Sequence, residues 1–120
     1  MGLTKHRRAL EDIAQNPHKI GIESSVTHVF IERGFYRGGS LYVEPDVLFY
    51  LDCGIYIPVE YKCNNEYSEK AKQQLIRSKE VLMEQLGCID PVMVYVYGNE
   101  PYSVRQLYEL NGKLNWEIVQ

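Results

Sequence analysis

The chain has 120 residues, enough for one domain with a single hydrophobic core. Hydrophobic residues make up 45% and charged residues 24%, values typical of globular proteins, so a disordered or fibrous chain is excluded. The net charge of −3 does not by itself indicate a nucleic-acid-binding protein, because such domains commonly carry an excess of basic residues. We therefore expect one α/β domain over residues 1–120.

The first elements in chain order are two predicted helices. Thr4 is a good N-cap for a short helix over 5–15, which Asn-Pro would end. A second helix is predicted over 20–33, because apolar residues recur there at i, i+4, i+7 and i+8 and Gly34 follows. A glycine-rich loop at 36–40 comes next.

The middle and end of the chain predict strands around one long helix. Strand-forming residues fill 41–52 and 55–62. The longest helix is predicted over 66–86, where an apolar stripe ends at a glycine. A nearly continuous apolar run over 91–98 is typical of a strand buried on both faces. The remaining predicted elements are a short helix at 103–110 and a last strand at 113–119.

Compartment and cysteine content give a further expectation. No apolar run approaches the roughly 18 residues that span a bilayer, and the first residues, MGLTKHRRALED, lack the apolar block of a signal peptide. The three cysteines are odd in number and have no C-x-x-C spacing, which disfavours a disulfide framework and structural zinc. We expect a cytoplasmic protein with reduced cysteines.

The predicted hairpin sets the register of its two strands. If residues 52–54 form a three-residue loop, Asp46 lies opposite Glu60 and Glu44 lies opposite Lys62. A bulge would shift this register by one residue. In the unshifted register, Glu44 opposite Lys62 is either its ion-pair partner, which is the favoured role, or a second acidic group at a metal.

Two carboxylates facing each other on neighbouring strands suggest a cation between them. Like charges in this position are destabilising, so Asp46 opposite Glu60 favours a bound ion. Oxygen ligands without histidine or cysteine suit Mg²⁺ or Mn²⁺, which accept phosphate as a further ligand. Lys62 lies on the same strand face as Glu60 and can orient water or stabilise charge on phosphorus. The pattern predicts phosphodiester chemistry, and a solvated strand face is the alternative.

Helical geometry adds two candidates. At about 100° per residue, Gln74 lies about 70° from the centre of the buried stripe, whereas Gln73 points into solvent. On the helix predicted over 20–33, Glu23 lies about 75° from the centre of its stripe and could reach a metal through a water molecule.

These residues resemble the PD-(D/E)XK nuclease superfamily, whose pattern spans about residues 21–98 of this chain. The matching features are an acidic residue on a leading helix, Pro-Asp at a strand start, acidic-x-Lys on the next strand, and a helical glutamine. In this sequence they are Glu23, Pro45-Asp46, Glu60-Tyr61-Lys62 and Gln74. The resemblance implies a restriction-endonuclease-like fold: a central mixed β-sheet flanked by helices, with an αβββαβ core and here an extra N-terminal helix.

The resemblance also implies an activity, Mg²⁺-dependent or Mn²⁺-dependent cleavage of DNA. Asp46, Glu60 and the carbonyl of Tyr61 would be the metal ligands, and Lys62 would be the catalytic lysine. Within the superfamily the chain looks most like archaeal Holliday-junction resolvases, which act as dimers on branched DNA. Those enzymes place a loop residue before the Pro-Asp strand near the site, a part that Ser40 or Arg37 would play.

Local basic clusters are the candidate DNA-binding surfaces, with solvated faces as the alternative. They give a set of expected DNA contacts: Arg33, Arg37, Ser40, Lys70 and Lys72. Two other function classes compete with a nuclease. One is a nucleic-acid-binding module of the same fold that does not cleave, and the other is an oligomerising structural protein.

Overall fold

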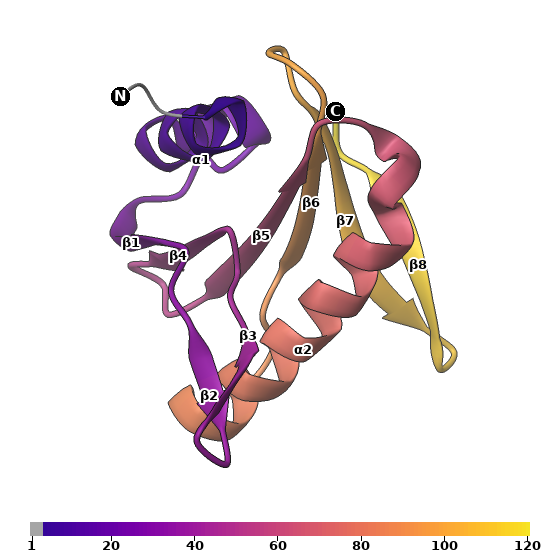
Figure 1. Ribbon diagram of the computed structural model, residues 1–120. Helices are drawn as coiled ribbons and strands as arrows, with labels where there is room; N and C mark the ends of the chain where they lie inside the picture. The colour runs from indigo at the N-terminus through magenta and orange to yellow at the C-terminus, as the bar shows by residue number, and fades with distance from the viewer. Residues whose placement is uncertain (1–3) are drawn as a thin grey trace.

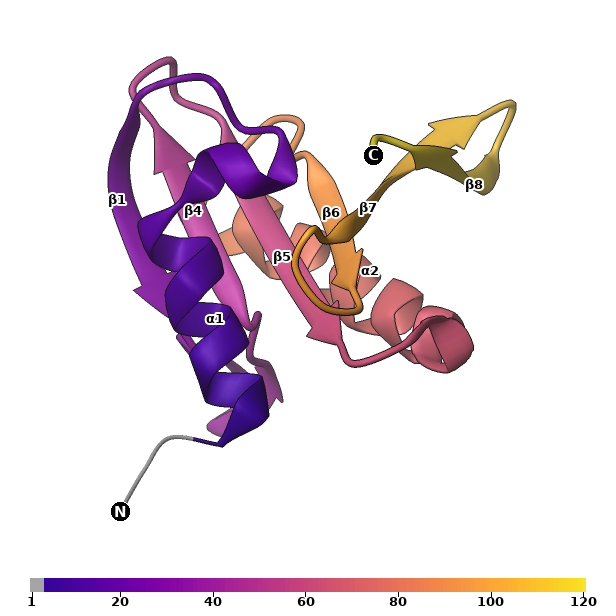
Figure 2. The same ribbon diagram turned by 90° about the horizontal axis from the view of Figure 1, so that it is seen from above.

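A six-stranded mixed β-sheet with a helix on each face forms the body of the protein (Figures 1 and 2). The computed structural model describes residues 4–120. The sheet order is β1-β4-β5-β6-β7-β8, and β2 and β3 form a separate hairpin. The elements are α1 (Lys5–Gln15), a 3₁₀ turn (Pro17–Ile20), β1 (Val26–Ile31), β2 (Phe35–Arg37), β3 (Ser40–Val43), β4 (Val47–Leu51), β5 (Tyr56–Lys62), a second 3₁₀ turn (Asn65–Tyr67), α2 (Ser68–Leu86), β6 (Met93–Tyr97), β7 (Ser103–Leu110) and β8 (Lys113–Ile118).

Helix α1 begins and ends where its sequence signals predict. The Thr4 hydroxyl accepts a hydrogen bond from the backbone N–H of Arg7 at 3.1 Å, which satisfies one donor of the first turn. Leu10 and Ile13 are fully buried in a cluster with residues of β4 and β5. Their burial holds α1 against one face of the sheet, as Figure 2 shows.

The helix predicted over 20–33 is wrong. The 3₁₀ turn ends at Gly21, whose φ of 87° lies in the left-handed region, and the chain then runs extended into β1. Most residues of β1 are β-branched and favour a strand, and antiparallel pairing with β4 supplies hydrogen bonds that outweigh the helical spacing of the apolar residues. Only α1 therefore precedes the sheet, and the predicted extra N-terminal helix is absent from the described residues. The order α1-β1-β4-β5-α2-β6 is αβββαβ.

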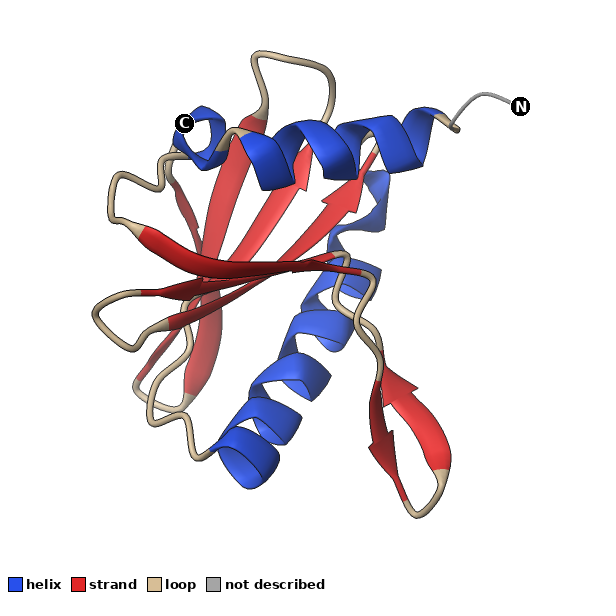
Figure 3. Ribbon diagram, turned by 90° about the vertical axis from the view of Figure 1, so that its left-hand side faces the viewer, coloured by secondary structure: helices blue, strands red, loops and turns tan. Residues whose placement is uncertain are grey.

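The strand predicted over 41–52 is broken at Glu44-Pro45-Asp46. Proline has no N–H for a sheet ladder, so pairing with the neighbouring strand cannot continue through it. The chain before the break, β3, pairs instead with β2 in a hairpin that projects beyond the main sheet (Figure 3). Arg37 near the hairpin tip forms ion pairs with Glu80 and Glu84 of α2.

The register predicted for the β4–β5 hairpin is confirmed. Leu51 donates its N–H to the carbonyl of Ile55 at 2.9 Å, and further along the hairpin Val47 pairs with Val59. Gly54, with φ of 90°, supplies the left-handed conformation of the loop.

Helix α2 and β6 complete the core as predicted. Helix α2 connects β5 to the parallel strand β6 and packs on the sheet face opposite α1. Its buried residues include Leu75 and Leu82, and it ends at Gly87 with φ of 65°. Strand β6 is buried on both faces, and no helix in the described part of the chain is long and apolar enough to cross a membrane.

The short helix predicted over 103–110 is also wrong, because this segment is β7. Val104 packs in the core under α1, whereas Leu107 packs in the core under α2, so the two side chains lie on opposite faces of the sheet. Their i, i+3 spacing suits a helix, but it also suits a strand buried on both faces. The last predicted strand is confirmed as β8.

Candidate functional site

Asp46 and Glu60 face each other where β4 begins. The backbone N–H of Asp46 donates to Glu60 Oε2 at 3.1 Å, and the N–H of Tyr61 donates to Asp46 Oδ2 at 2.8 Å. These two bonds continue the β4–β5 ladder through side chains after proline has interrupted it. One oxygen of each carboxylate is thereby fixed by the backbone of the other strand.

The second oxygen of each carboxylate accepts no backbone hydrogen bond of this kind from the described residues. Glu60 is fully buried, and its Oε1 has no hydrogen-bond partner among the described residues. Asp46 Oδ1 lies 3.5 Å from His6 Nε2 of α1. A buried carboxylate oxygen without a partner is costly, so a ligand that satisfies Glu60 Oε1 would stabilise this arrangement.

Both carboxyl groups have raised pKa values. Burial raises the pKa of Glu60 well above its usual value, and the neighbouring Asp46 raises it further. Burial also raises the pKa of Asp46, against the opposing effects of the Tyr61 N–H, His6 and Lys62. A cation between the two groups would favour the ionised form of both.

A backbone carbonyl lies beside the pair. Continuing the register beyond Val47↔Val59 places Pro45 opposite Tyr61. The N–H and C=O of a strand residue point to the same neighbour, so the Tyr61 carbonyl faces Pro45, which has no N–H to donate. This carbonyl and one oxygen each of Asp46 and Glu60 are all hard oxygen donors, which fit Mg²⁺ or Mn²⁺. Among residues 4–120 there is no group of three or more His, Cys, Asp or Glu side chains arranged to hold a metal, so a bound ion would also need backbone or water ligands.

Lys62 lies two residues after Glu60 at the end of β5, and its side chain is partly exposed. Its backbone carbonyl accepts the N–H of Gly98 at 3.2 Å, which fixes the strand end. Its ammonium group lowers the pKa of both Asp46 and Glu60, although burial outweighs this effect in each. Lys62 makes no ion pair within the described residues, so its charge is available to a ligand.

The expected pairing of Glu44 with Lys62 is wrong. Strand β3 ends before Glu44, so this residue lies in the connection to β4 and outside the β4–β5 ladder. It forms no ion pair with Lys62, and its charge instead contributes to the raised pKa of Glu60.

Gln74 occupies the flank of α2 that helical geometry predicts. Its side-chain Oε1 is buried without a hydrogen-bond partner in the described residues, whereas Gln73 is exposed. Ser78, one turn further along α2, also has a buried hydroxyl without such a partner. Glu60, whose Oε1 is also without a partner, belongs to β5, one of the strands against which α2 packs.

The predicted placement of Glu23 is wrong. Glu23 lies in the exposed loop before β1, near Leu51. Asp46 adjoins the opposite end of β4, about 17 Å away at the usual rise of a strand. Glu23 therefore cannot join the site, even through one water molecule.

His6 is the residue near the carboxylates that the sequence did not indicate. It lies on α1, lines a cleft, and has its ring 5.8 Å from that of Tyr61. The only signal was its position in the basic segment KHRR at 5–8, which is equally typical of a solvated helix face.

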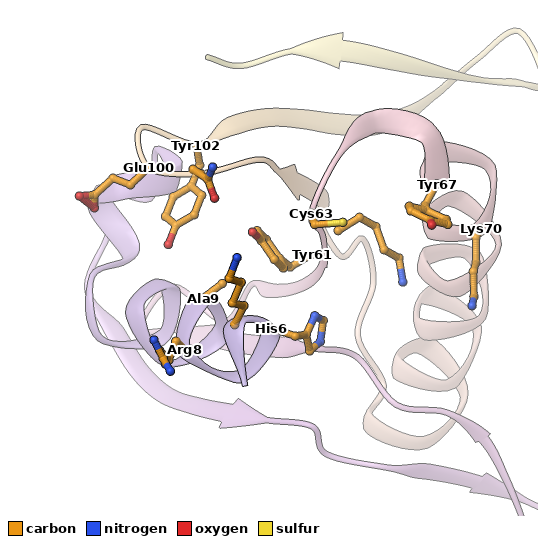
Figure 4. A pocket seen from close by; sticks show the side chains of 12 residues that line it. His6, Arg8, Ala9, Tyr61, Cys63, Tyr67, Lys70, Glu100 and Tyr102 are labelled. Atoms are coloured by element: carbon orange, nitrogen blue, oxygen red, sulfur yellow. The ribbon is translucent and has the colours of Figure 1, made fainter. Parts of the chain in front are cut away.

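A cleft of about 760 Å³, shown in Figure 4, is lined by His6 and Lys62, which neighbour the carboxylate pair, but not by Asp46 or Glu60 themselves. Its walls are α1, the end of β5, the start of α2 and the β6–β7 loop. Four of its side chains are lysine or arginine, one is histidine, and three are tyrosine. The lining residues are Lys5, His6, Arg8, Ala9, Tyr61, Lys62, Cys63, Tyr67, Lys70, Asn99, Glu100 and Tyr102.

The predicted DNA-binding residues fall in two places. Lys70 lines the cleft, and Lys72 lies on the same helix, 3.8 Å from Glu69. The other three belong to the β2–β3 region. There Arg33 stacks over the rings of Phe30 and Phe35, Arg37 is paired with α2, and Ser40 is exposed.

The comparisons with known proteins give no relative. No protein-family model, curated protein sequence or solved structure matches this chain significantly.

Proposed function

We propose that this protein is a metal-dependent endonuclease that hydrolyses DNA phosphodiester bonds, with a restriction-endonuclease-like fold of the PD-(D/E)XK type. The observation that carries this proposal is the Asp46–Glu60 pair, in which backbone N–H groups fix one oxygen of each carboxylate. The buried Glu60 Oε1 is left without a partner among the described residues. A cation held by Asp46 and Glu60 would remove this cost.

The residues of the pair and their neighbours have separate roles in the proposed reaction. Asp46, Glu60 and the Tyr61 carbonyl would hold Mg²⁺ or Mn²⁺. A bound ion of this kind supplies a water molecule of lowered pKa and polarises the phosphate. The Lys62 ammonium stabilises negative charge that develops on the phosphate oxygens in the transition state. Gln74 donates its amide N–H to a water molecule or a phosphate oxygen beside Glu60.

A cleavage assay tests the proposal. Single-stranded, duplex, flapped and four-way-junction DNA are each incubated with the protein and Mg²⁺, Mn²⁺ or EDTA. We expect metal-dependent cleavage, with a preference for branched DNA, the substrate of the junction resolvases that this chain resembles. Binding to DNA without cleavage in any metal would overturn the proposal in favour of a non-catalytic binding module.

Replacing Asp46 with asparagine should weaken metal binding. Asparagine keeps the shape of the side chain but removes its charge, so the Mg²⁺ concentration that gives half the maximal cleavage rate should rise at least about tenfold. A titration of rate against Mg²⁺ measures this change. Asp52→Asn is the matched control, because Asp52 is an exposed carboxylate that directly follows β4, at the end of this strand opposite Asp46. Equal Mg²⁺ requirements in wild type and Asp46→Asn would contradict the assignment.

Gln74 and Gln73 offer an internal comparison on one helix. Gln74→Ala removes an amide whose oxygen is buried without a partner in the described residues, and it should lower the cleavage rate constant about tenfold, within the range found for groups that orient metal ligands. Gln73→Ala removes an exposed amide and should change the rate less than twofold. Single-turnover kinetics on the preferred substrate measure the cleavage rate constants of both variants. A larger effect of Gln73→Ala than of Gln74→Ala would show that Gln74 has no part in the site.

A homodimer and a cytoplasmic location belong to the same proposal. One chain carries one Asp46–Glu60 pair, so cutting both strands of a duplex or junction in one encounter needs two copies. Analytical ultracentrifugation with and without a four-way junction measures the assembly. A 1:1 complex as the sole cleaving species would exclude the dimer.

A further inference from the structure

The cleft beside the carboxylate pair carries an excess of positive charge. Glu100 is the one carboxylate among its described lining residues, and it is ion-paired with Lys19 outside the lining. Lys5, Lys62 and Lys70 make no ion pair with a described residue. An anion that enters the cleft therefore meets several ammonium groups and no unpaired carboxylate, which favours phosphate.

Two of the three tyrosines in the cleft are held by hydrogen bonds, and the third is exposed. The Tyr61 hydroxyl donates to the carbonyl of Gly98 at 2.6 Å, and the Tyr102 hydroxyl donates to Asp12 at 2.6 Å. These bonds hold the two rings, which meet edge to face and are almost fully buried, as part of the cleft wall. Tyr67 differs, because it is 46% exposed and makes no ring contact within the described residues.

The arrangement in Figure 4 separates these features across the cleft. Tyr61, Tyr102 and His6 lie on the α1 side, whereas Tyr67 and Lys70 lie together on the α2 side, with Cys63 between the two groups. Lys70 lies in the first turn of α2, and Tyr67, the last residue of the second 3₁₀ turn, is at the N-cap position, where no side chain caps the helix. The positive end of the helix dipole thus adds to the charge on this side.

We propose that the cleft binds one unpaired DNA nucleotide, its base on Tyr67 and its phosphate at Lys70, and so feeds a single strand to the carboxylate pair. A base inside a duplex has both faces covered by its neighbours, so a tyrosine ring can stack only on an unstacked base. The volume of about 760 Å³ is that of a small-molecule site and is too small for a duplex. That the strand leads to the carboxylate pair rests on the proposed nuclease function. The inference predicts that the protein prefers DNA with an unpaired segment.

Binding without cleavage tests the inference separately from the nuclease. In EDTA at fixed salt, a fluorescent single-stranded dodecamer is displaced by unlabelled single strand, blunt duplex or thymidine monophosphate, and anisotropy is recorded. We expect the single strand to bind at least tenfold more tightly than the duplex. Tyr67→Leu should weaken single-strand binding about tenfold, the loss of one stacked base.

Lys70→Gln provides a second variant at an exposed position that leaves the fold intact. It should weaken single-strand binding and reduce the slope of log affinity against log salt by about 0.7, the loss of one phosphate contact. Tyr108→Leu and Lys113→Gln in the β7–β8 hairpin are matched controls and should leave both quantities unchanged.

Two results would overturn the inference. Equal affinity for single strand and duplex, unaffected by Tyr67→Leu, would show that the cleft takes no unpaired base. Displacement by thymidine monophosphate at the same concentration as the strand would show a site for free nucleotides. Either result leaves the nuclease proposal to its own test, the metal-dependent cleavage assay.

Discussion

Replacing Lys62 with alanine is expected to lower the rate constant of DNA cleavage by a factor of about 10²–10³, the usual cost of removing one group that stabilises transition-state charge. Lys62 emerges on the face of β5 that carries Glu60, and its charge is not used in an ion pair within the described residues. The Lys62 ammonium interacts with negative charge that develops on the phosphate during the reaction. Its removal should therefore lower the rate of the chemical step more than the affinity for DNA.

Single-turnover cleavage measures the rate of the chemical step, and fluorescence anisotropy in EDTA measures the affinity for DNA. DNA affinity should fall only a few-fold, because Lys62 is one of several basic groups at the cleft. Lys113→Ala on the far hairpin is the matched control for loss of one lysine and should retain the wild-type rate. Cleavage that survives in Lys62→Ala would remove this lysine from the mechanism and contradict the role that the PD-(D/E)XK resemblance assigns to it.

Local signals predicted the elements whose ends are set by a few neighbouring residues. Thr4 caps α1, Gly87 ends α2, and the three-residue loop at Gly54 fixes the β4–β5 register that brings Asp46 to Glu60. Each depends on contacts within a short stretch of chain. The central pair of the candidate site could therefore be placed from the sequence.

Tertiary pairing decided the segments that the sequence did not predict correctly. The segments that became β1 and β7 carry apolar residues at spacings that suit a helix, but each lies beside a strand edge that it completes. The wrong helix over 20–33 also misplaced Glu23, which lies in a loop near the end of β4 opposite Asp46. His6 and the cleft could not be predicted, because they arise where residues 5–9 meet residues 61–70 and 99–102.

Replacing Glu60 with glutamine is expected to stabilise the protein in the absence of metal. Burial, and then Asp46, raise the pKa of Glu60 in the folded state, so the folded protein binds more protons than the unfolded chain above about pH 4.3. The free energy of unfolding of the wild type therefore falls as the pH rises from that value to the raised folded pKa, and stays lower above it. Glutamine does not titrate, so the free energy of unfolding of Glu60→Gln should fall less as the pH rises. At neutral pH the variant should be more stable than the wild type by about 1–3 kcal/mol.

Metal should reverse the order of the two proteins. Mg²⁺ that binds between Asp46 and Glu60 favours the ionised folded state, so millimolar Mg²⁺ should raise the Tm of the wild type and leave that of Glu60→Gln unchanged. Thermal unfolding in EDTA and in Mg²⁺ at several pH values measures both effects, with Glu109→Gln in β7 as the exposed control. If Glu60→Gln were less stable than wild type in EDTA and both responded equally to Mg²⁺, the buried oxygen would have a partner other than a metal. Because folding is measured without substrate, the result bears on the metal site whether or not the correct DNA has been found.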